Sequence, residues 1–500
     1  MADQIHAAVD FLVIGAGVVG CAIARELARS RCRVLVVEAA EDVGEGASKA
    51  NSSILHTGFD AKPGTLEARL VSAGWRLWRE LAGELDLPIE SIGALMVALD
   101  EHEQRALEYW FENGRANGVV DLLLLSPDEV RSHYPAAPTS VRGGLLIPGE
   151  SITCTMNAVI ALAEQAAVNG VTFLLGTRAL GIERIDSSSV WVRTARGRFP
   201  TRWVIDAAGV WADEVAEWVG LDGFRLTPRK GEFLVLDKTA RAHVPHILLP
   251  VPTPVSKGIL VTPTVYGNVL LGPTADDLDD KRDLSVSLTG LRRVREAALR
   301  LAPSLATEEP IASYAGIRAV HSSGDYQIAV FPRERLVVTA GIRSTGLSAA
   351  PAIARYVVES LCEHGERLDL EAPLKPRPRP LWSPGTPRPC TQPNHVERDP
   401  RAGRVLCLCE LVSEAEIRAV FQRPIPVTTL DGVRKRTWAT AGRCQGFYCL
   451  AAILRVMSEE LRVPVTALTK RGGGSWLVRR HGSHRDERER SGHAGTPADR

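Results

Sequence analysis

The sequence predicts an α/β protein, α+β overall, in which a Rossmann-like dinucleotide-binding domain contains an inserted β-rich domain and is followed by a small helical domain. Three observations predict this fold class. A glycine-rich turn joins a buried strand to a helix near the N-terminus, short strands separated by Gly and Pro turns follow in mid-chain, and four cysteines lie beyond a proline-rich stretch. With 500 residues the chain is too long for a single core, so several domains are expected.

The composition is that of an ordinary globular protein, with 45% hydrophobic and 24% charged residues. A formal net charge of +1 favours no nucleic-acid partner. Nine cysteines, an odd number spread unevenly, do not match a secreted disulfide framework. The apolar run at residues 11–24 is broken by three glycines, so it predicts neither a signal peptide nor a membrane-spanning helix. We therefore expect a cytoplasmic, reducing location.

The first element is a glycine-rich turn, GAGVVG, between a buried strand and a helix. Gly15 permits the tight turn, Gly17 lets a pyrophosphate approach the backbone, and Gly20 lets the helix pack on the strand. The helix N-terminus offers free N–H groups to phosphate. Glu38 ends the next strand, 18 residues after Gly20, and is placed to accept hydrogen bonds from a ribose. The turn predicts a dinucleotide site; the alternative is a turn that serves packing only.

We expect the dinucleotide to be FAD, because the chain contains one such fingerprint and no second one for NAD(P)H. Two later turns support this interpretation. The segment VIDAAGVWADEVA supplies Ala208 and Gly209, and a glycine-rich turn that opens a late helix supplies Gly341 and Gly346. Flavoproteins of this architecture use such late turns against FAD, with a helix dipole directed at the flavin ring.

The remaining segments suggest where the domains begin and end. Amphipathic patterns predict helices at 62–84 and 157–169, and nine prolines in residues 371–400 predict an extended linker. The expected domains are an FAD-binding domain, a β-rich substrate domain, the linker, a cysteine-containing domain and a disordered tail. Their predicted residues are, in that order, 1–84 with 146–225 and 316–370; 85–145 with 226–315; 371–402; 403–470; and 481–500.

The cysteines near the end form the pattern C-x-C-x34-C-x4-C. Cys407 and Cys409 stand one residue apart, so on a strand both sulfurs lie on one side of the backbone. Such a pair suits a shared metal centre and cannot easily form its own disulfide. Cys444 and Cys449 complete the set. Structural zinc and unliganded cysteines are the alternatives, although zinc sites more often use paired C-x2-C.

Several motifs between about residues 10 and 360 resemble the D-amino-acid-oxidase-like superfamily of flavoproteins. They more closely resemble its glycerol-3-phosphate dehydrogenase and oxidase branch, with 2-hydroxyglutarate dehydrogenases nearby. The resemblance implies an FAD-dependent enzyme that oxidises a CH–OH group of a small anionic substrate. The motifs that carry it are GAGVVG, NSSILHTGFDAKPG, DAAGVWAD, TPRKGEF, LVTPTVYGNVLLGPTA, AGIRAV and GIRSTGLSAAPAIA.

The resemblance implies that His56 lies beside the flavin ring and takes the hydroxyl proton, a role that suits a histidine near neutral pH. A structural histidine and a covalent flavin attachment are the alternatives. Ser48 and Asn51, in the same loop, are the implied flavin contacts. Ser53 departs from the family, in which glycine is usual at this position.

The resemblance also implies an anion site. Arg318 matches the family's substrate arginine and Lys257 a lysine of the same pocket, and either could instead be a surface charge. An arginine fork suits phosphate or carboxylate alike. Ser344 and Thr345 lie on the turn expected to face flavin and substrate, although relatives often have proline at 345.

The cysteine pattern and its flanking sequence resemble the bacterioferritin-associated-ferredoxin-like [2Fe–2S] domain. That resemblance implies a [2Fe–2S] cluster held by Cys407, Cys409, Cys444 and Cys449. Relatives usually have arginine and glycine where this chain has Trp438 and Thr440.

Together the two resemblances imply a dehydrogenase that oxidises glycerol-3-phosphate to dihydroxyacetone phosphate by hydride transfer to flavin. Electrons would leave through the cluster to a partner protein or quinone. The enzyme could form a hetero-oligomer with that partner, and any contact with a membrane would be made through the partner. Open alternatives are a 2-hydroxyacid dehydrogenase, the flavin subunit of an amine- or imino-acid-oxidising complex, and a non-catalytic electron-transfer subunit. The presence of His56, Lys257 and Arg318 argues against the last.

Overall fold

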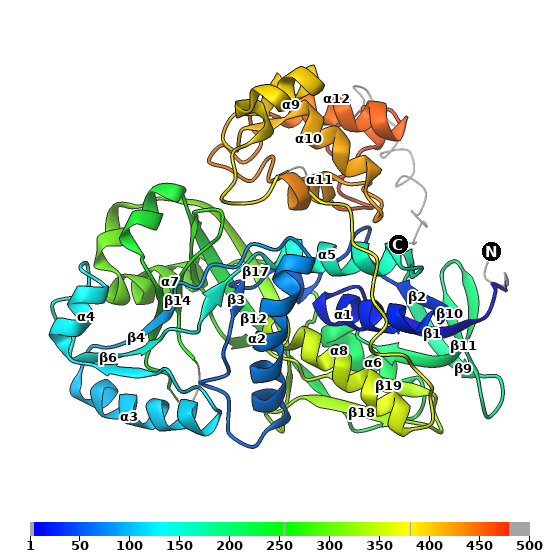
Figure 1. Ribbon diagram of the computed structural model, residues 1–500, viewed down its shortest axis with the longest axis horizontal. Helices are drawn as coiled ribbons and strands as arrows, with labels where there is room; N and C mark the ends of the chain where they lie inside the picture. The colour runs from blue at the N-terminus through cyan, green and yellow to red at the C-terminus, as the bar shows by residue number, and fades with distance from the viewer. Residues whose placement is uncertain (1–4, 254–256, 381, 480–500) are drawn as a thin grey trace, which may run out of the picture.

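Two large β-sheets organise the chain in the computed structural model, which describes residues 5–253, 257–380 and 382–479 (Figure 1). The disordered tail predicted at 481–500 lies outside the described residues. Within the described residues, no helix has the length and apolar character that crossing a membrane requires.

The first sheet has a parallel centre, as the glycine-rich turn predicts. Among the described residues it has eight strands, in the order β18-β19-β11-β1-β2-β8, with β10 and β9 added antiparallel beside β11. The strands are β1 (Val9–Ile14), β2 (Val34–Val37), β8 (Thr172–Leu174), β9 (Ala179–Arg184), β10 (Val190–Thr194), β11 (Gly197–Asp206), β18 (Gln327–Phe331) and β19 (Leu336–Ala340). β2 is buried throughout, as parallel strands covered on both faces usually are.

Helices cover both faces of this sheet. Alternate residues of a strand point to opposite faces, so each buried strand contributes side chains to two separate cores. Phe11 and Val13 of β1 belong to the core under the large helices, whereas Leu12 and Ile14 pack with α6 (Ala212–Glu217). The large helices are α1 (Val18–Leu27), α2 (Leu66–Glu84), α5 (Thr155–Val168) and α8 (Gly346–Glu363). The predicted helices 62–84 and 157–169 thus correspond to α2 and α5, with shifted ends.

The second sheet is mainly antiparallel. In the part of the chain that the structure describes it has nine strands, ordered β16-β12-β15-β14-β13-β4-β6-β5 with β17 beside β12. The strands are β4 (Ala94–Ala98), β5 (Leu123–Leu125), β6 (Gly143–Ile147), β12 (Leu226–Leu236), β13 (Ile247–Pro250), β14 (Leu260–Pro263), β15 (Val269–Gly272), β16 (Asp276–Asp277) and β17 (Pro310–His321). Its helices are α3 (Glu101–Ala116), α4 (Pro127–His133) and α7 (Leu288–Leu301).

One predicted boundary needs correction. The division at 315/316 falls inside β17, which pairs with β12 from Pro310 to His321 without a break at that point. A continuous antiparallel ladder cannot be divided between two units, and only the pairing partner reveals its length. Arg318 therefore belongs to a strand of the second sheet, and it lines a cavity together with residues at the ends of the strands of the first sheet.

The C-terminal segment has its own small core of Val412, Ile417, Val433, Ile453 and neighbouring residues. Figure 1 shows it, in gold to red, beside α5. Its elements are η6 (Pro389–Thr391), α9 (Pro393–Arg398), η7 (Pro400–Gly403), β20 (Val405–Cys407), β21 (Val412–Ser413), α10 (Glu414–Ala419), η8 (Val420–Gln422), α11 (Leu430–Thr437), α12 (Leu450–Leu461) and η9 (Val465–Ala467).

The linker predicted at 371–402 is only partly extended. Residues 371–380 and 382–388 contain neither helix nor strand, but within 389–403 lie the short helices η6, α9 and η7, which belong to the C-terminal segment and pack on α10 and β21. Arg377 is 8% exposed and donates hydrogen bonds to Glu164 and to the Leu85 carbonyl. The proline-rich composition could not predict this anchoring, because the partners of Arg377 are a carboxylate and a carbonyl that lie far from it in the sequence.

The contact between α2 and α8 gives a test of the fold. A Cβ added at Gly74 would lie 2.1 Å from the Ser348 carbonyl oxygen, whereas one at Gly83, in the same helix, would meet nothing within 4 Å. We expect Gly74→Ala to lower the free energy of unfolding by about 1–3 kcal/mol through overpacking. Gly83→Ala should raise it by about 0.5–1 kcal/mol. Thermal unfolding of both variants measures this; equal melting temperatures would contradict the close helix contact.

Candidate active site and cysteine cluster

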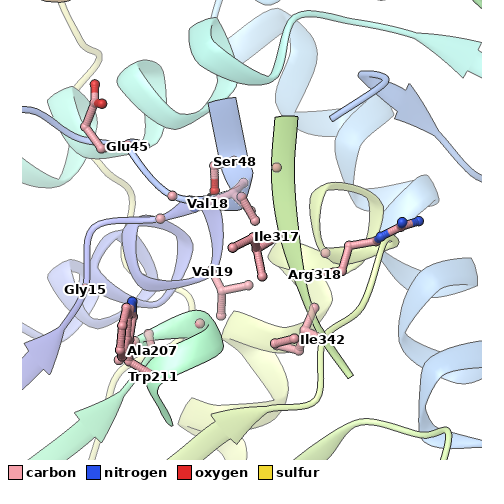
Figure 2. A pocket seen from close by; sticks show the side chains of 18 of the residues that line it. Gly15, Val18, Val19, Glu45, Ser48, Ala207, Trp211, Ile317, Arg318 and Ile342 are labelled. Carbon is pink, nitrogen blue, oxygen red and sulfur yellow. Dashed lines mark hydrogen bonds between the residues drawn. The ribbon is translucent and has the colours of Figure 1, made fainter. Parts of the chain in front are cut away.

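A cavity of about 480 Å³ opens where β1, β2, β11 and β19 end, and β17 forms part of its wall (Figure 2). Its size is typical of ligand sites. Gly20, Gly341, Thr345, His56 and Lys257 do not line it. The residues predicted from the sequence that do line it are Gly15, Gly17, Glu38, Ser48, Asn51, Ala208, Gly209, Arg318, Ser344 and Gly346.

The three glycines of the first turn each meet a different steric demand. Gly15 has φ +102°, and a Cβ there would lie 2.5 Å from the Ala207 carbonyl oxygen. A Cβ at Gly20 would lie 2.0 Å from the Gly15 carbonyl oxygen, so only glycine lets α1 approach the turn this closely. Gly17 lines the cavity, and a Cβ added there would lie 3.3 Å from Ser48 Oγ. This cradle fits a pyrophosphate at the start of α1.

Two side chains hold the cradle. Glu38 accepts hydrogen bonds from Ala16 N at 2.7 Å and from Ala40 N at 2.9 Å, and burial raises the pKa of its carboxyl despite these bonds. Ser48 Oγ accepts from Val18 N at 2.9 Å, in the first turn of α1. Asn51 donates to the Ser48 carbonyl and accepts from Thr155 Oγ1. The predicted cofactor contacts are therefore also the residues that shape the site.

The late turn before α8 separates two residues that the sequence had grouped together. Ser344 is exposed and lines the cavity. Thr345 is 2% exposed, donates to Glu67 Oε1 at 2.6 Å and lies 2.7 Å from Tyr326 Oη. Its hydroxyl is thus engaged away from the cavity, which does not support the substrate contact predicted for it.

His56 lies just after β3 (Ile54–Leu55), which pairs with β7 (Ser151–Ile152) and so brings Glu150 beside it. His56 Nδ1 is 2.9 Å from Glu150 Oε2, and Glu150 is 1% exposed. The other oxygen of Glu150 accepts from Thr57 N and Thr57 Oγ1. Burial acts to lower the pKa of His56, but the charge and hydrogen bond of Glu150 and the charge of Asp60 outweigh it and raise the pKa.

Lys257 and Asp60 form an ion pair next to this histidine. Lys257 Nζ lies 2.6 Å from Asp60 Oδ2, with the lysine side chain 40% exposed and the aspartate 8%. Burial acts to raise the pKa of Asp60, but the positive charges of Lys257 and His56 lower it overall. Asp60 thus pairs with Lys257, and its charge also acts on His56, which is far from Lys257 in the sequence.

Arg318, on β17, lies across the cavity from Gly15 (Figure 2). It donates to the carbonyls of Thr274 at 2.5 Å and Lys230 at 3.3 Å. Burial lowers the pKa of its guanidinium to about 10, so it remains charged at neutral pH. Among the described residues no carboxylate is within ion-pair distance of it. A cation without a carboxylate partner at a cavity wall is suited to an anionic ligand.

The four cysteines approach each other as two pairs. Cys407 interacts with Cys449 and Cys409 with Cys444; the first pair is buried and the second reaches the surface. The hydrogen bond from Cys449 lowers the pKa of Cys407 to about 6. Across the described chain, no three His, Cys, Asp or Glu side chains gather around one metal position. Two thiol pairs fit a dinuclear cluster with two thiolates per iron better than a single zinc ion.

Two departures from the family fall where the backbone favours glycine. Ser53 has φ +59° and Thr440 has φ +68°, in the left-handed region. Ser53 is held by hydrogen bonds from its N–H to Asn51 and between its hydroxyl and Thr155. The Thr440 N–H donates to the sulfurs of Cys407 and Cys449, so this strained residue contacts the cluster site directly.

Comparison with known proteins gives two family matches and close relatives. Residues 10–360 match the FAD dependent oxidoreductase family and residues 405–459 the BFD-like [2Fe-2S] binding domain. A glycerol 3-phosphate dehydrogenase of Caloramator mitchellensis is 35% identical over 94% of this chain and 98% of its own. A glycerol 3-phosphate oxidase of Mycoplasma pneumoniae is 32% identical over 70% of this chain and 94% of its own.

Solved structures agree with this match. The FAD-bound L-alpha-glycerophosphate oxidase from Mycoplasma pneumoniae superposes with a TM-score of 0.67, at 30% identity, over 75% of this chain and 97% of that one. Glycine oxidase from Geobacillus kaustophilus gives 0.67 at 26% identity, over 73% and 98%. The fold and site thus define a flavoprotein with a second redox centre. The chain belongs to the FAD-dependent oxidoreductase family, and its cofactors are FAD and a [2Fe–2S] cluster, which confirms the predicted fold class and cofactors.

Sequence reasoning missed Glu150 and Asp60. Asp60 follows His56 by four residues in the same loop, so its position could have suggested a partner. Glu150 carries no such local signal, because only the pairing of β3 with β7 brings it to His56.

The cluster assignment has a direct test with a matched control. We expect Cys409→Ser to lose most iron and the broad iron–sulfur absorption while keeping flavin, because a thiolate ligand is removed. Cys390→Ser should keep the cluster, because Cys390 only donates to the Leu411 carbonyl, which a serine can also do. Iron analysis and the absorption spectrum measure both. Wild-type protein with one zinc and no iron would refute the assignment.

Proposed function

We propose that this enzyme oxidises the secondary alcohol of glycerol-3-phosphate to dihydroxyacetone phosphate. The observation that carries the proposal is the 35% identity to a protein named glycerol 3-phosphate dehydrogenase across 98% of its length, cluster segment included. Bound FAD would accept the hydride, and the [2Fe–2S] cluster would pass electrons onward. An electron exit of this kind supports a dehydrogenase that serves a partner protein or quinone, within a hetero-oligomer, over an oxidase that uses O2.

His56 is the proposed base for the hydroxyl proton. Because Glu150 Oε2 lies 2.9 Å from Nδ1, its negative charge favours a proton on that nitrogen, and Nε2 is the ring nitrogen left to take the substrate proton. The His56 N–H donates to Ser348 Oγ at 2.8 Å, so the main chain beside the ring is held by α8. Neutral His56 is the active form, and its raised pKa therefore means that activity falls as the pH drops through that pKa.

Arg318 and Lys257 are the proposed cations for the phosphate. Arg318 remains charged and unneutralised on the cavity wall, and Lys257 extends from the His56–Asp60 side with its side chain partly exposed. Ser344, exposed on the late turn, is the proposed hydroxyl contact. A carboxylate would satisfy the same groups, which is why relatives named L-2-hydroxyglutarate dehydrogenase, 26% identical, suggest the main competing substrate class.

The substrate proposal is tested by anaerobic absorption spectroscopy of the purified holoenzyme. Glycerol-3-phosphate should bleach the flavin bands and the iron–sulfur absorption, whereas 2-hydroxyglutarate and glycine should not. Bleaching by 2-hydroxyglutarate alone would replace phosphate with carboxylate, and bleaching by glycine alone would indicate amine oxidation. No bleaching by any of the three would refute the proposed reaction.

The base proposal predicts a pH effect for Glu150→Gln. A glutamine amide donates to Nδ1 and removes the negative charge, so it both favours the wrong tautomer and lowers the pKa of His56. We expect kcat to fall by about 10²-fold or more and the acidic limb of kcat/KM to move down by about one pH unit. Thr57→Val, which removes a hydrogen bond to Glu150 but keeps its charge, should leave that limb in place. An unshifted limb in Glu150→Gln would exclude His56 as the titrating group.

A further inference from the structure

The cluster-binding segment touches the wall of the FAD site. Helix α11 lies against α5 and against the loop of residues 38–49, called here the FAD loop, which runs from the end of β2 to Lys49 (Figure 1). Seven residues of this loop line the cavity, among them Glu38, Glu45 and Ser48; Figure 2 shows the last two on the same side of it. The contact between loop and helix is made mostly by charged groups.

Lys435 and Arg436 of α11 make these contacts. Lys435 Nζ donates to the Val43 carbonyl at 2.9 Å and lies 2.6 Å from Glu45 Oε1 and 2.8 Å from Asp42 Oδ2. Arg436 places Nη1 and Nη2 on the two oxygens of Asp42, at 2.8 and 3.0 Å. The helix therefore grips the loop at one carbonyl and two carboxylates.

These charges are removed from water. Asp42 is 2% exposed, Lys435 4%, and the Arg436 side chain 5%. Burial opposes the charge of Asp42, but Arg436 and Lys435 outweigh it and lower the pKa of Asp42 to about 2. Removing one partner from such a group leaves a buried charge uncompensated, so this position of the loop is stabilised by the charges of α11.

The contacts between α11 and the FAD loop are close in sequence to the residues that form the phosphate-binding turn. Glu45 also pairs with Lys49 at 2.5 Å, and Ser48, between them, accepts the Val18 N–H at the start of α1. We propose that α11 completes the FAD site, with Lys435 and Arg436 as positioning residues that hold the FAD loop in its binding conformation. By linkage, FAD bound to the loop stabilises the docked position of the cluster-binding segment to the same extent.

Other contacts keep the segment attached when this grip is weakened. Trp438 packs on Tyr266 with ring centroids 3.9 Å apart, Lys238 lies 2.9 Å from Glu410, and Arg423 pairs with Glu164. A substitution at Lys435 therefore tests the loop and does not by itself release the segment. The inference depends on FAD binding and is independent of which substrate is oxidised.

The first test is FAD affinity of full-length protein stripped of flavin, measured by quenching of flavin fluorescence. We expect Lys435→Met, which keeps an apolar stem, to raise the dissociation constant about tenfold or more. The control is Lys470→Met. Lys470 pairs with Asp431 of α11 but is about half exposed and does not contact the FAD loop, so this change should alter the dissociation constant by less than about twofold. Wild-type affinity in Lys435→Met would overturn the inference.

The second test is made on the wild-type chain, so it does not depend on how a variant folds. We expect FAD to slow amide hydrogen exchange both in residues 38–49 and in α11, 430–437, with exchange in α3 unchanged. Slowing confined to residues 38–49 would show that loop and helix are not coupled, and would overturn the inference even if glycerol-3-phosphate proves to be the substrate. Conversely, coupled slowing stands if another substrate is found.

Discussion

The close approach of α1 to the turn after β1 is the constraint on which the rest of the site depends. Gly20 has room for no Cβ, because one would lie 2.0 Å from the Gly15 carbonyl oxygen. With α1 seated there, its first N–H groups face the cavity, and Glu38, Ser48 and the turn at Ala207 close around them through hydrogen bonds to Ala16, Val18 and Ile14. A displaced α1 would separate the phosphate donors from every other wall of the site.

Charge in the buried parts of this protein is kept by pairing. His56 with Glu150, Lys257 with Asp60, and Lys435 and Arg436 with Asp42 are each charged groups that burial alone would tend to neutralise. Arg318 is different, because it is bonded to backbone carbonyls and has no carboxylate partner among the described residues. Arg318 therefore keeps a positive charge that no carboxylate neutralises, which leaves this charge available to an anionic ligand.

The cluster-binding segment is attached to the FAD-binding domain by more contacts than a flexible proline-rich linker alone would provide. Arg377 anchors the connecting segment to Glu164, and α11 grips the FAD loop with buried ion pairs. Trp438 packs on Tyr266, whose hydroxyl accepts from Asn157 in α5. The cluster-binding segment is therefore attached both to the domain of the first sheet and to the domain of the second. Attachment at several points suits electron transfer from flavin to the cluster, because the two redox centres must remain close.

The sequence by itself determined the parts whose physics is local. The GAGVVG turn and the buried strands around it predict the parallel part of the first sheet and a dinucleotide, because the geometry of such a turn is set by neighbouring residues. The C-x-C pair predicts a shared metal centre, which the resemblance of the flanking sequence specifies as a [2Fe–2S] cluster. Only the tertiary structure decided that Glu150 reaches His56, that Thr345 turns to Glu67 while Ser344 faces the cavity, and that Lys435 holds Asp42. These contacts depend on strand pairing and helix docking between distant segments, and a single buried carboxylate or lysine leaves no periodic pattern in the chain.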